Sequence, residues 1–82
     1  MNMLHDRVVR LIEDVPGVRR KVENESRLVE DLGFDSIKMV ELMGAIEDEF
    51  NLIITLDDAT SISTVADLKS MVQEAMQAQG VS

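Results

Sequence analysis

Residues 36–50 carry the pattern that most limits how this chain can fold. Their apolar side chains recur every three or four positions, which is the spacing of one face of an α-helix. Asp35 stands directly before them, and aspartate is a favoured N-cap because its carboxylate accepts from the free amides of the first turn. The pattern therefore predicts a helix from Ser36 to about Phe50. The stripe that this helix would bury consists of Met39, Leu42, Met43, Ile46 and Phe50.

Ser36 would be the first residue of this helix, and that position has chemical consequences. Phe34 and Met39 stand where a hydrophobic staple forms, which fixes the angle of entry and leaves the hydroxyl of Ser36 facing water. The first amides of a helix lack internal partners, and the macrodipole adds a partial positive charge there. A phosphate ester on Ser36 would therefore be well placed.

The opposite face of the same helix is not a plain polar surface. Two aliphatic side chains and a glycine stand among three acids, whereas an ordinary surface helix is polar throughout this face. The set consists of Ile37, Val40, Glu41, Gly44, Glu47 and Asp48. The mixture predicts a docking face, a surface that recognises partners with basic and apolar groups.

A first helix is predicted from about Asn2 or Met3 to Asp14, because apolar residues recur there at helical spacing and Pro16-Gly17 would end it. Residues 16–35 then form a long connection, which is unusual in a small domain unless it is functional or well packed. The apolar residues that would pin this connection to the core are Leu28, Val29 and Leu32.

Two capping boxes mark the remaining helices. Thr55-Leu56-Asp57-Asp58 predicts a short helix through about Thr60, and Thr64-Val65-Ala66-Asp67 predicts a last helix that frays after about Gln79. The expected fold is all-α: a small four-helix bundle of three longer helices and one short helix, with a long loop between the first and second. We expect a single domain over residues 1–82, with an ordered core at about 3–78.

The net charge of −8 is unevenly distributed. Residues 1–34 hold seven acids and six bases, whereas residues 35–82 hold nine acids and two bases. Nucleic-acid binding would require the opposite sign. The acid excess begins at Asp35, so we interpret it as a field that steers basic partners toward Ser36. A solvated, solubilising surface is the simpler alternative.

Catalytic machinery is missing from the sequence. A serine nucleophile needs a base within reach, and the single histidine, His5, belongs to another helix with no visible partner, at an expected solvent-facing or boundary position. No metal-ligand cluster and no calcium-loop spacing occur, so we expect no catalytic residue and no metal. Because there is no cysteine, no signal-peptide pattern and no membrane-spanning run, we expect a cytoplasmic monomer without membrane insertion.

Four features together resemble the acyl carrier protein family. They are Gly33, the pair Asp35-Ser36 followed by an aliphatic residue, Val40-Glu41-Leu42, and Glu47-Asp48-Glu49-Phe50. The resemblance extends over nearly the whole chain, because length, acidity and helix order also fit. It implies that a phosphopantetheinyl transferase, using coenzyme A and Mg²⁺, attaches 4′-phosphopantetheine to Ser36 with support from Asp35.

The resemblance also implies the function. The thiol of the arm would hold an acyl or aminoacyl thioester and present it to acyl-loading and acyl-processing enzymes with basic surfaces. Carriers of fatty acid synthesis usually have leucine and then an acid after the serine, where this chain has Ile37 and Lys38. Gly44 stands in place of a larger apolar residue, and Thr55 in place of a frequent proline. These departures favour a specialised carrier, for a polyketide, a nonribosomal peptide or an unusual acyl product.

The sequence also allows other functions. The chain could be a peptidyl or aminoacyl carrier, or an unmodified acidic adaptor that binds partners through its helices. A hydrolase that uses Ser36 is the weakest alternative, because no base is visible.

Overall fold

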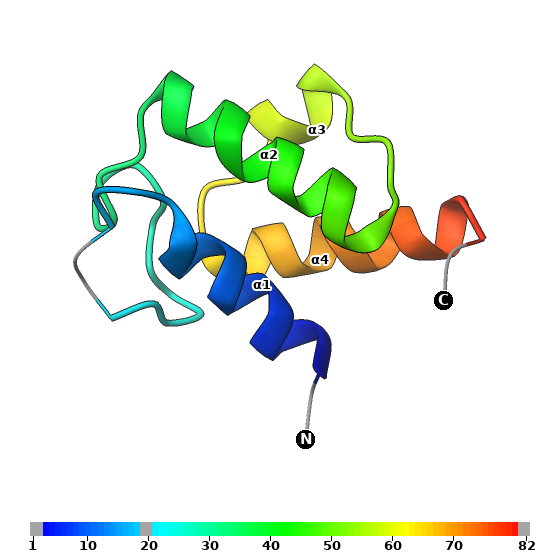
Figure 1. Cartoon of the computed structure of the whole chain (residues 1–82), viewed down its shortest axis with the longest axis horizontal. Helices are drawn as coiled ribbons and strands as arrows, with labels where there is room; N and C mark the ends of the chain where they lie inside the picture. Colours follow the sequence, from blue (N-terminus) through cyan, green and yellow to red (C-terminus); the bar gives the residue numbers. More distant parts are fainter. Residues whose placement is uncertain (1–2, 19–20, 81–82) are drawn as a thin grey trace.

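The chain folds into four α-helices around one apolar core (Figure 1), in a computed structural model that describes residues 3–18 and 21–80. The helices are α1 (Met3–Asp14), α2 (Ser36–Phe50), α3 (Leu56–Thr60) and α4 (Val65–Ala78). The predicted all-α fold of three longer helices and one short helix is confirmed. Within the described ranges there is no strand, only an isolated antiparallel bridge between Arg27 and Thr64. The alternative helix start at Asn2 lies outside the described residues.

The core lies between α1, α2 and α4, and α1 contacts both of the other long helices. The buried residues of the three helices are Val8 and Ile12, then Leu42, Met43, Ile46 and Phe50, then Val65, Leu68 and Val72. The predicted apolar stripe of α2 is thus buried, apart from the half-buried Met39. No described helix has the length and apolarity needed to span a bilayer.

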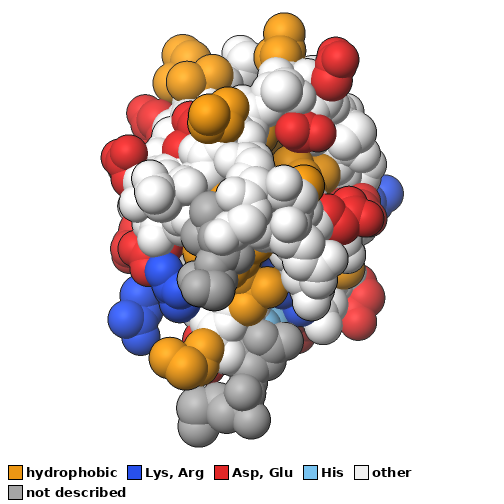
Figure 2. All heavy atoms as spheres, turned by 90° about the vertical axis from the view of Figure 1, so that its right-hand side faces the viewer, with side chains coloured by type: hydrophobic (Ala, Val, Ile, Leu, Met, Phe, Trp, Pro, Cys, Tyr) orange, Lys and Arg blue, Asp and Glu red, His pale blue; other side chains and the backbone are white. Residues whose placement is uncertain are grey.

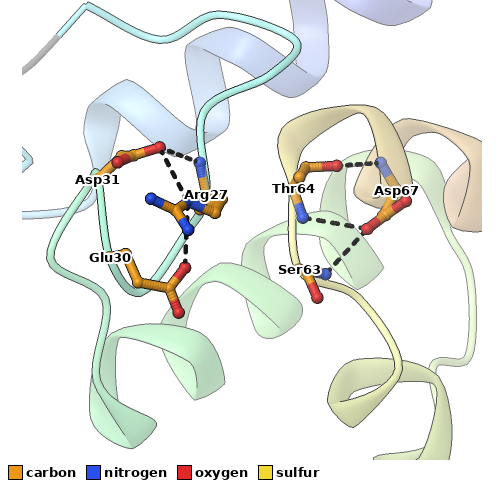
Figure 3. Close-up of polar contacts among 6 residues, drawn as sticks. All are labelled: Arg27, Glu30, Asp31, Ser63, Thr64 and Asp67. Carbon is orange, nitrogen blue, oxygen red and sulfur yellow. Dashed lines mark hydrogen bonds and ion pairs between the residues drawn. The ribbon is translucent and has the colours of Figure 1, made fainter.

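Both predicted capping boxes form as expected. At the start of α4, the hydroxyl of Thr64 accepts from the amide of Asp67 at 3.1 Å, and the Asp67 carboxylate accepts from the amides of Thr64 and Ser63, each at 3.1 Å (Figure 3). These amides lower the pKa of Asp67, with that of Thr64 contributing most. A lowered pKa means that this stabilisation is complete above the ordinary value and is lost as pH falls through the folded value.

The long connection between α1 and α2 is fastened to the start of α4 by backbone hydrogen bonds. The amide of Leu28 donates to the carbonyl of Ser63 at 2.9 Å, and the amide of Val65 donates to the carbonyl of Ser26 at 3.0 Å. A third bond joins the amide of Ala66 to the carbonyl of Asn24 at 3.0 Å. These bonds explain how a connection without a helix of its own remains packed.

One of the three residues expected to pin this connection does not do so. Arg27 opens a tight turn in which its carbonyl accepts from two later amides and the Asp31 carboxylate accepts from its own amide at 2.8 Å (Figure 3). The turn directs Leu28 and Leu32 into the core, as predicted. Val29 instead lies on the outer side of the turn and is 59% exposed, so its predicted role was wrong.

His5 also differs from the expectation. It is half-buried on α1, which fits a boundary position, but it is not without a partner. The ammonium of Lys69 lies 2.7 Å from Nδ1 of His5 and also donates to the side-chain oxygen of Asn24. Lys69 therefore links α4 to α1 and to the long connection. The partner is separated from His5 by most of the chain, so local pattern could not indicate it.

Candidate functional site

The turn before α2 exposes Ser36 to solvent. Gly33 has φ +78°, in the left-handed region that favours glycine, and the next residue turns inward. Phe34 is only 2% exposed, and its amide donates to the carbonyl of Leu28 at 2.9 Å. Asp35 then adopts an extended conformation, and its carboxylate accepts from the amide of Lys38 at 2.9 Å. Ser36 follows as the first residue of α2 and is exposed.

The pKa of Asp35 is held below the ordinary value of an aspartate. The hydrogen bond from the Lys38 amide is the largest cause of its lowered pKa, and the Lys38 ammonium, 3.6 Å from the carboxylate, contributes further. The cap is therefore complete above the ordinary carboxyl pKa and is lost as pH falls through the lowered value. An exposed carboxylate beside the Ser36 hydroxyl has free oxygen positions with which to meet a cation or a donor of another protein.

Lys38 is directed away from the predicted docking face. Its side chain is 28% exposed and pairs with Asp35, and its Cε lies 3.0 Å from where a side chain on Gly17 would begin. The positive charge that the sequence placed among the acids is therefore balanced locally, at the edge facing the α1–α2 connection. It does not cancel the acids farther along α2.

Ser36 also lines a groove of about 630 Å³ between α2 and α3. The α2 residues that line it recur at helical spacing along one side of the helix: Ser36, Met39, Val40, Met43, Gly44 and Glu47. The opposite wall and the ends come from Leu28, Val29, Ile54, Thr55, Leu56, Ala59, Thr60 and Ile62. With a rise of 1.5 Å per residue, the α2 side extends for about 16 Å from Ser36.

Apolar side chains make up most of the wall of the groove. Among its polar side chains, Thr55 accepts from the amide of Asp58, and Thr60 donates to the carbonyl of Asp57. Glu47 accepts from the amide of Ile54 at 3.0 Å. Because most of its lining side chains are apolar, the groove suits a hydrocarbon chain better than a cargo rich in oxygen or nitrogen.

The predicted docking face has both of its expected components. Ile37, Val40, Glu41 and Asp48 are exposed, whereas Gly44 and Glu47 are half-buried because they also line the groove. A methyl group added at Gly44 would meet no atom within 4 Å, so this glycine leaves open space in the groove wall. Figure 2, which views the molecule from the right-hand side of Figure 1, shows apolar and acidic side chains gathered at the upper end, where α3 lies in Figure 1.

The groove itself was not predicted from the sequence. The second wall of the groove depends on where α3 and the long connection pack. The periodicity of apolar residues within one helix does not predict that position. Val40 gave a signal, as an aliphatic residue on the acidic face of the predicted helix. Within the described residues, no group of three or more acids or histidines could hold a metal ion, and His5 is in contact with Lys69.

Ser36 thus lies exposed at a helix start, next to an apolar groove, where another enzyme can reach it. Comparison with known families specifies the class. Residues 6–72 match the family model described as "Phosphopantetheine attachment site". The chain belongs to this family of phosphopantetheine-bearing carrier proteins, and within it to the acyl carrier proteins.

Individual relatives support the same assignment. The chain is 35% identical over 75 residues to the acyl carrier protein of Buchnera aphidicola subsp. Baizongia pistaciae, covering 90% of this chain and 96% of that protein. Its fold is similar to that of a protein described as an acyl carrier protein from Mycobacterium tuberculosis, with TM-score 0.80, 34% identity, and 87% and 96% of the two chains covered. The acyl carrier protein of Thermotoga maritima gives TM-score 0.76, 30% identity, and coverage of 93% and 94%.

These findings confirm the expected class. The protein is an acyl carrier protein with a covalently attached 4′-phosphopantetheine arm, and it is a carrier rather than an enzyme. Enzymes that modify it and enzymes that process its acyl cargo are therefore its partners. The described residues fit the arm, because an exposed hydroxyl lies at the start of α2, where the first amides of the helix favour a phosphate.

Proposed function

We propose that Ser36 is the residue that carries the arm, within a single monomeric carrier domain spanning residues 1–82. The observation that supports this most directly is the exposed Ser36 at the rim of the groove, at the end of α2 where the first amides favour a phosphate. The Ser36 oxygen bonds to the phosphorus that bears pantetheine, the pyrophosphate bond of coenzyme A breaks, and adenosine 3′,5′-bisphosphate leaves. A base of the transferase takes the hydroxyl proton, and Asp35 supports the transferase complex and its Mg²⁺.

The proposal is tested by loading the protein with phosphopantetheine and then identifying the modified residue. Purified protein is incubated with a phosphopantetheinyl transferase, coenzyme A and Mg²⁺, and its intact mass is measured. A gain of about 340 Da, the formula mass of one covalent phosphopantetheine, is expected. Fragmentation of the loaded peptide should place the addition on Ser36. Addition at another residue would contradict the proposal, and no addition at all would favour the unmodified acidic adaptor.

The cargo that the groove supports best is a hydrocarbon acyl chain. The arm supplies a thiol that holds the cargo as a thioester, and the chain's own residues then shield the cargo from water. An extended chain advances about 1.2 Å per bond, because a peptide residue of three bonds spans about 3.3–3.6 Å. A groove of about 16 Å therefore accommodates roughly a dozen carbons. The mostly apolar lining of the groove supports this cargo over polyketide, aminoacyl or peptidyl intermediates.

Octanoyl cargo is therefore expected to stabilise the protein more than acetyl cargo does. The six additional methylenes could contribute at most about 5 kcal/mol if fully buried, at about 0.8 kcal/mol each. In an open groove we expect about 2 kcal/mol, which raises Tm by about 8–16 °C for a domain of this size. Differential scanning calorimetry of the octanoyl and acetyl forms measures this difference in Tm. Equal Tm values would show that the octanoyl chain stays in solvent.

We further propose that partners dock on the face formed by Ile37, Val40, Glu41, Gly44, Glu47 and Asp48. This proposal rests on the exposed apolar side chains next to exposed acids along the helix that begins at Ser36. The expected partners have basic surfaces, and their encounters occur in the cytoplasm, where coenzyme A and the transferase reaction are available. Charge-steered docking combines fast association with ready release, which a carrier needs.

Charge reversal on this face should slow loading. Glu41→Lys is expected to lower the rate of phosphopantetheine transfer about tenfold at low ionic strength, and the difference should shrink at high salt because exposed charges are screened. Glu74→Lys is the matched control, since Glu74 is an exposed acid on α4. Equal rates for Glu41→Lys and the native chain at low salt would contradict the docking face.

A further inference from the structure

The short helix α3 has no buried residue to hold it against the rest of the protein. Leu56 is 79% exposed, and Ala59 is only half-buried. Yet Leu56, Ala59 and Thr60 form one wall of the groove. Burial holds α3 only in part, through Ala59 and the flanking Ile54 and Ile62, so polar contacts to the neighbouring chain can also influence the width of the groove.

The connection that leads into α3 is fastened by side chains from two other helices. Gln79, at the end of α4, donates from Nε2 to the carbonyl of Ile53 at 3.0 Å and accepts from the amide of Ile53 at 3.0 Å. Glu47 of α2 accepts from the amide of the next residue, Ile54, at 3.0 Å. In Figure 1 the connection leaves the end of α2 beside the C-terminal half of α4 and then rises to α3.

The chemistry of the Gln79 contact is specific. A side-chain amide presents one donor and one acceptor in the same plane, which matches the N–H and C=O of a single extended residue. Ile53 is held by its backbone rather than by its side chain, which is 74% exposed. Ile54, held by Glu47, and the next residue, Thr55, both line the groove. The two contacts therefore act on the segment whose position sets where α3 begins.

We infer that Gln79 and Glu47 are positioning residues that set the width of the groove and thereby favour unbranched acyl chains. This inference rests on the proposed function, in which the groove holds the cargo. With both contacts formed, α3 is held at a fixed distance from α2, and a branched or ring-bearing chain has to displace it. Without them, α3 moves outward more readily, so wide cargo binds with less penalty while narrow cargo loses part of its packing.

The first test concerns the protein without cargo. Gln79→Ala is expected to speed hydrogen exchange of the amides in residues 53–60 about tenfold, since side-chain hydrogen bonds to this segment are lost. Gln77→Ala is the matched control, an exposed glutamine on the same helix, and it should leave these rates unchanged. Unchanged exchange in Gln79→Ala would overturn the inference.

The second test measures selectivity, which a general loss of stability does not shift. The native chain, Gln79→Ala and Gln77→Ala are each loaded with straight octanoyl cargo and with phenylbutanoyl cargo, and the Tm gain over the unloaded form is recorded. In the native chain and Gln77→Ala, octanoyl should give the larger gain. In Gln79→Ala the difference between the two cargoes should fall by at least half.

An unchanged difference between cargoes in folded Gln79→Ala overturns the role in selectivity. Gln79→Glu provides a second variant, because it keeps the acceptor for the Ile53 amide but places a carboxylate against the Ile53 carbonyl, and the same loss of selectivity is expected. Glu47→Ala removes the acceptor for the Ile54 amide and should lose selectivity in the same way. Failure of the native chain to be loaded at all would contradict the assignment of Ser36 instead, so the two failures are distinguishable.

Discussion

Ser36→Ala is expected to abolish phosphopantetheine loading completely, with no residual mass gain after prolonged incubation with transferase and coenzyme A. The bond to phosphorus forms through the hydroxyl oxygen, and alanine offers no nucleophile. The fold should be unaffected, because Ser36 is exposed and alanine is the better helix former. Intact mass and circular dichroism together separate this loss of chemistry from a loss of structure.

Ser70→Ala is the control for that experiment. Ser70 is exposed on α4, and its replacement should leave loading at the native level. Loading of Ser36→Ala would show that another side chain accepts the arm. Full partner binding by folded Ser36→Ala, together with no loading of the native chain, would instead support the adaptor hypothesis.

Phe34→Ala is expected to destabilise the protein by about 3–5 kcal/mol, because the aromatic ring is nearly fully buried and its removal leaves a cavity. A domain of this length has a total stability of roughly 4–12 kcal/mol, so the loss is a large fraction of it. The structural change should be greatest near the functional site, since Phe34 lies two residues before Ser36 and anchors the turn that presents it. Chemical denaturation measures the loss in free energy of unfolding.

Loading kinetics give a second readout for Phe34→Ala. The turn that presents Ser36 depends on burial of Phe34, so the loading rate should fall even in conditions where the variant remains mostly folded. Val29→Ala is the matched control, an exposed apolar residue of the same connection, and it should change stability by less than about 0.5 kcal/mol. A loss below about 1 kcal/mol for Phe34→Ala would contradict its role as an anchor.

Sequence patterns predicted the helices well because the interactions that define them are local. The Asp35 cap joins residues three positions apart, and both capping boxes join a threonine to an aspartate three positions later. A helix boundary can therefore be read from a few consecutive residues. The same locality made Ser36 recognisable as the first residue of α2.

Predictions failed where a residue's environment comes from distant parts of the chain. Val29 was expected in the core, but the turn opened by Arg27 leaves it exposed beside the groove. His5 showed no partner in the sequence, yet Lys69, 64 positions away, contacts its ring. Lys38 lies among the acids of α2 in the sequence, but in the fold it pairs with Asp35 and lies beside Gly17 of the distant connection.

By itself, the sequence determined the four helices, the exposed serine and the mixed apolar and acidic face of α2, because periodicity and capping act over three or four residues. Only the tertiary structure decided that this serine opens onto an apolar groove and that Gln79, 26 positions from Ile53, holds the far wall in place. The physical reason is that a groove has no local signature: its width is the distance between helices, and contacts between remote residues set that distance.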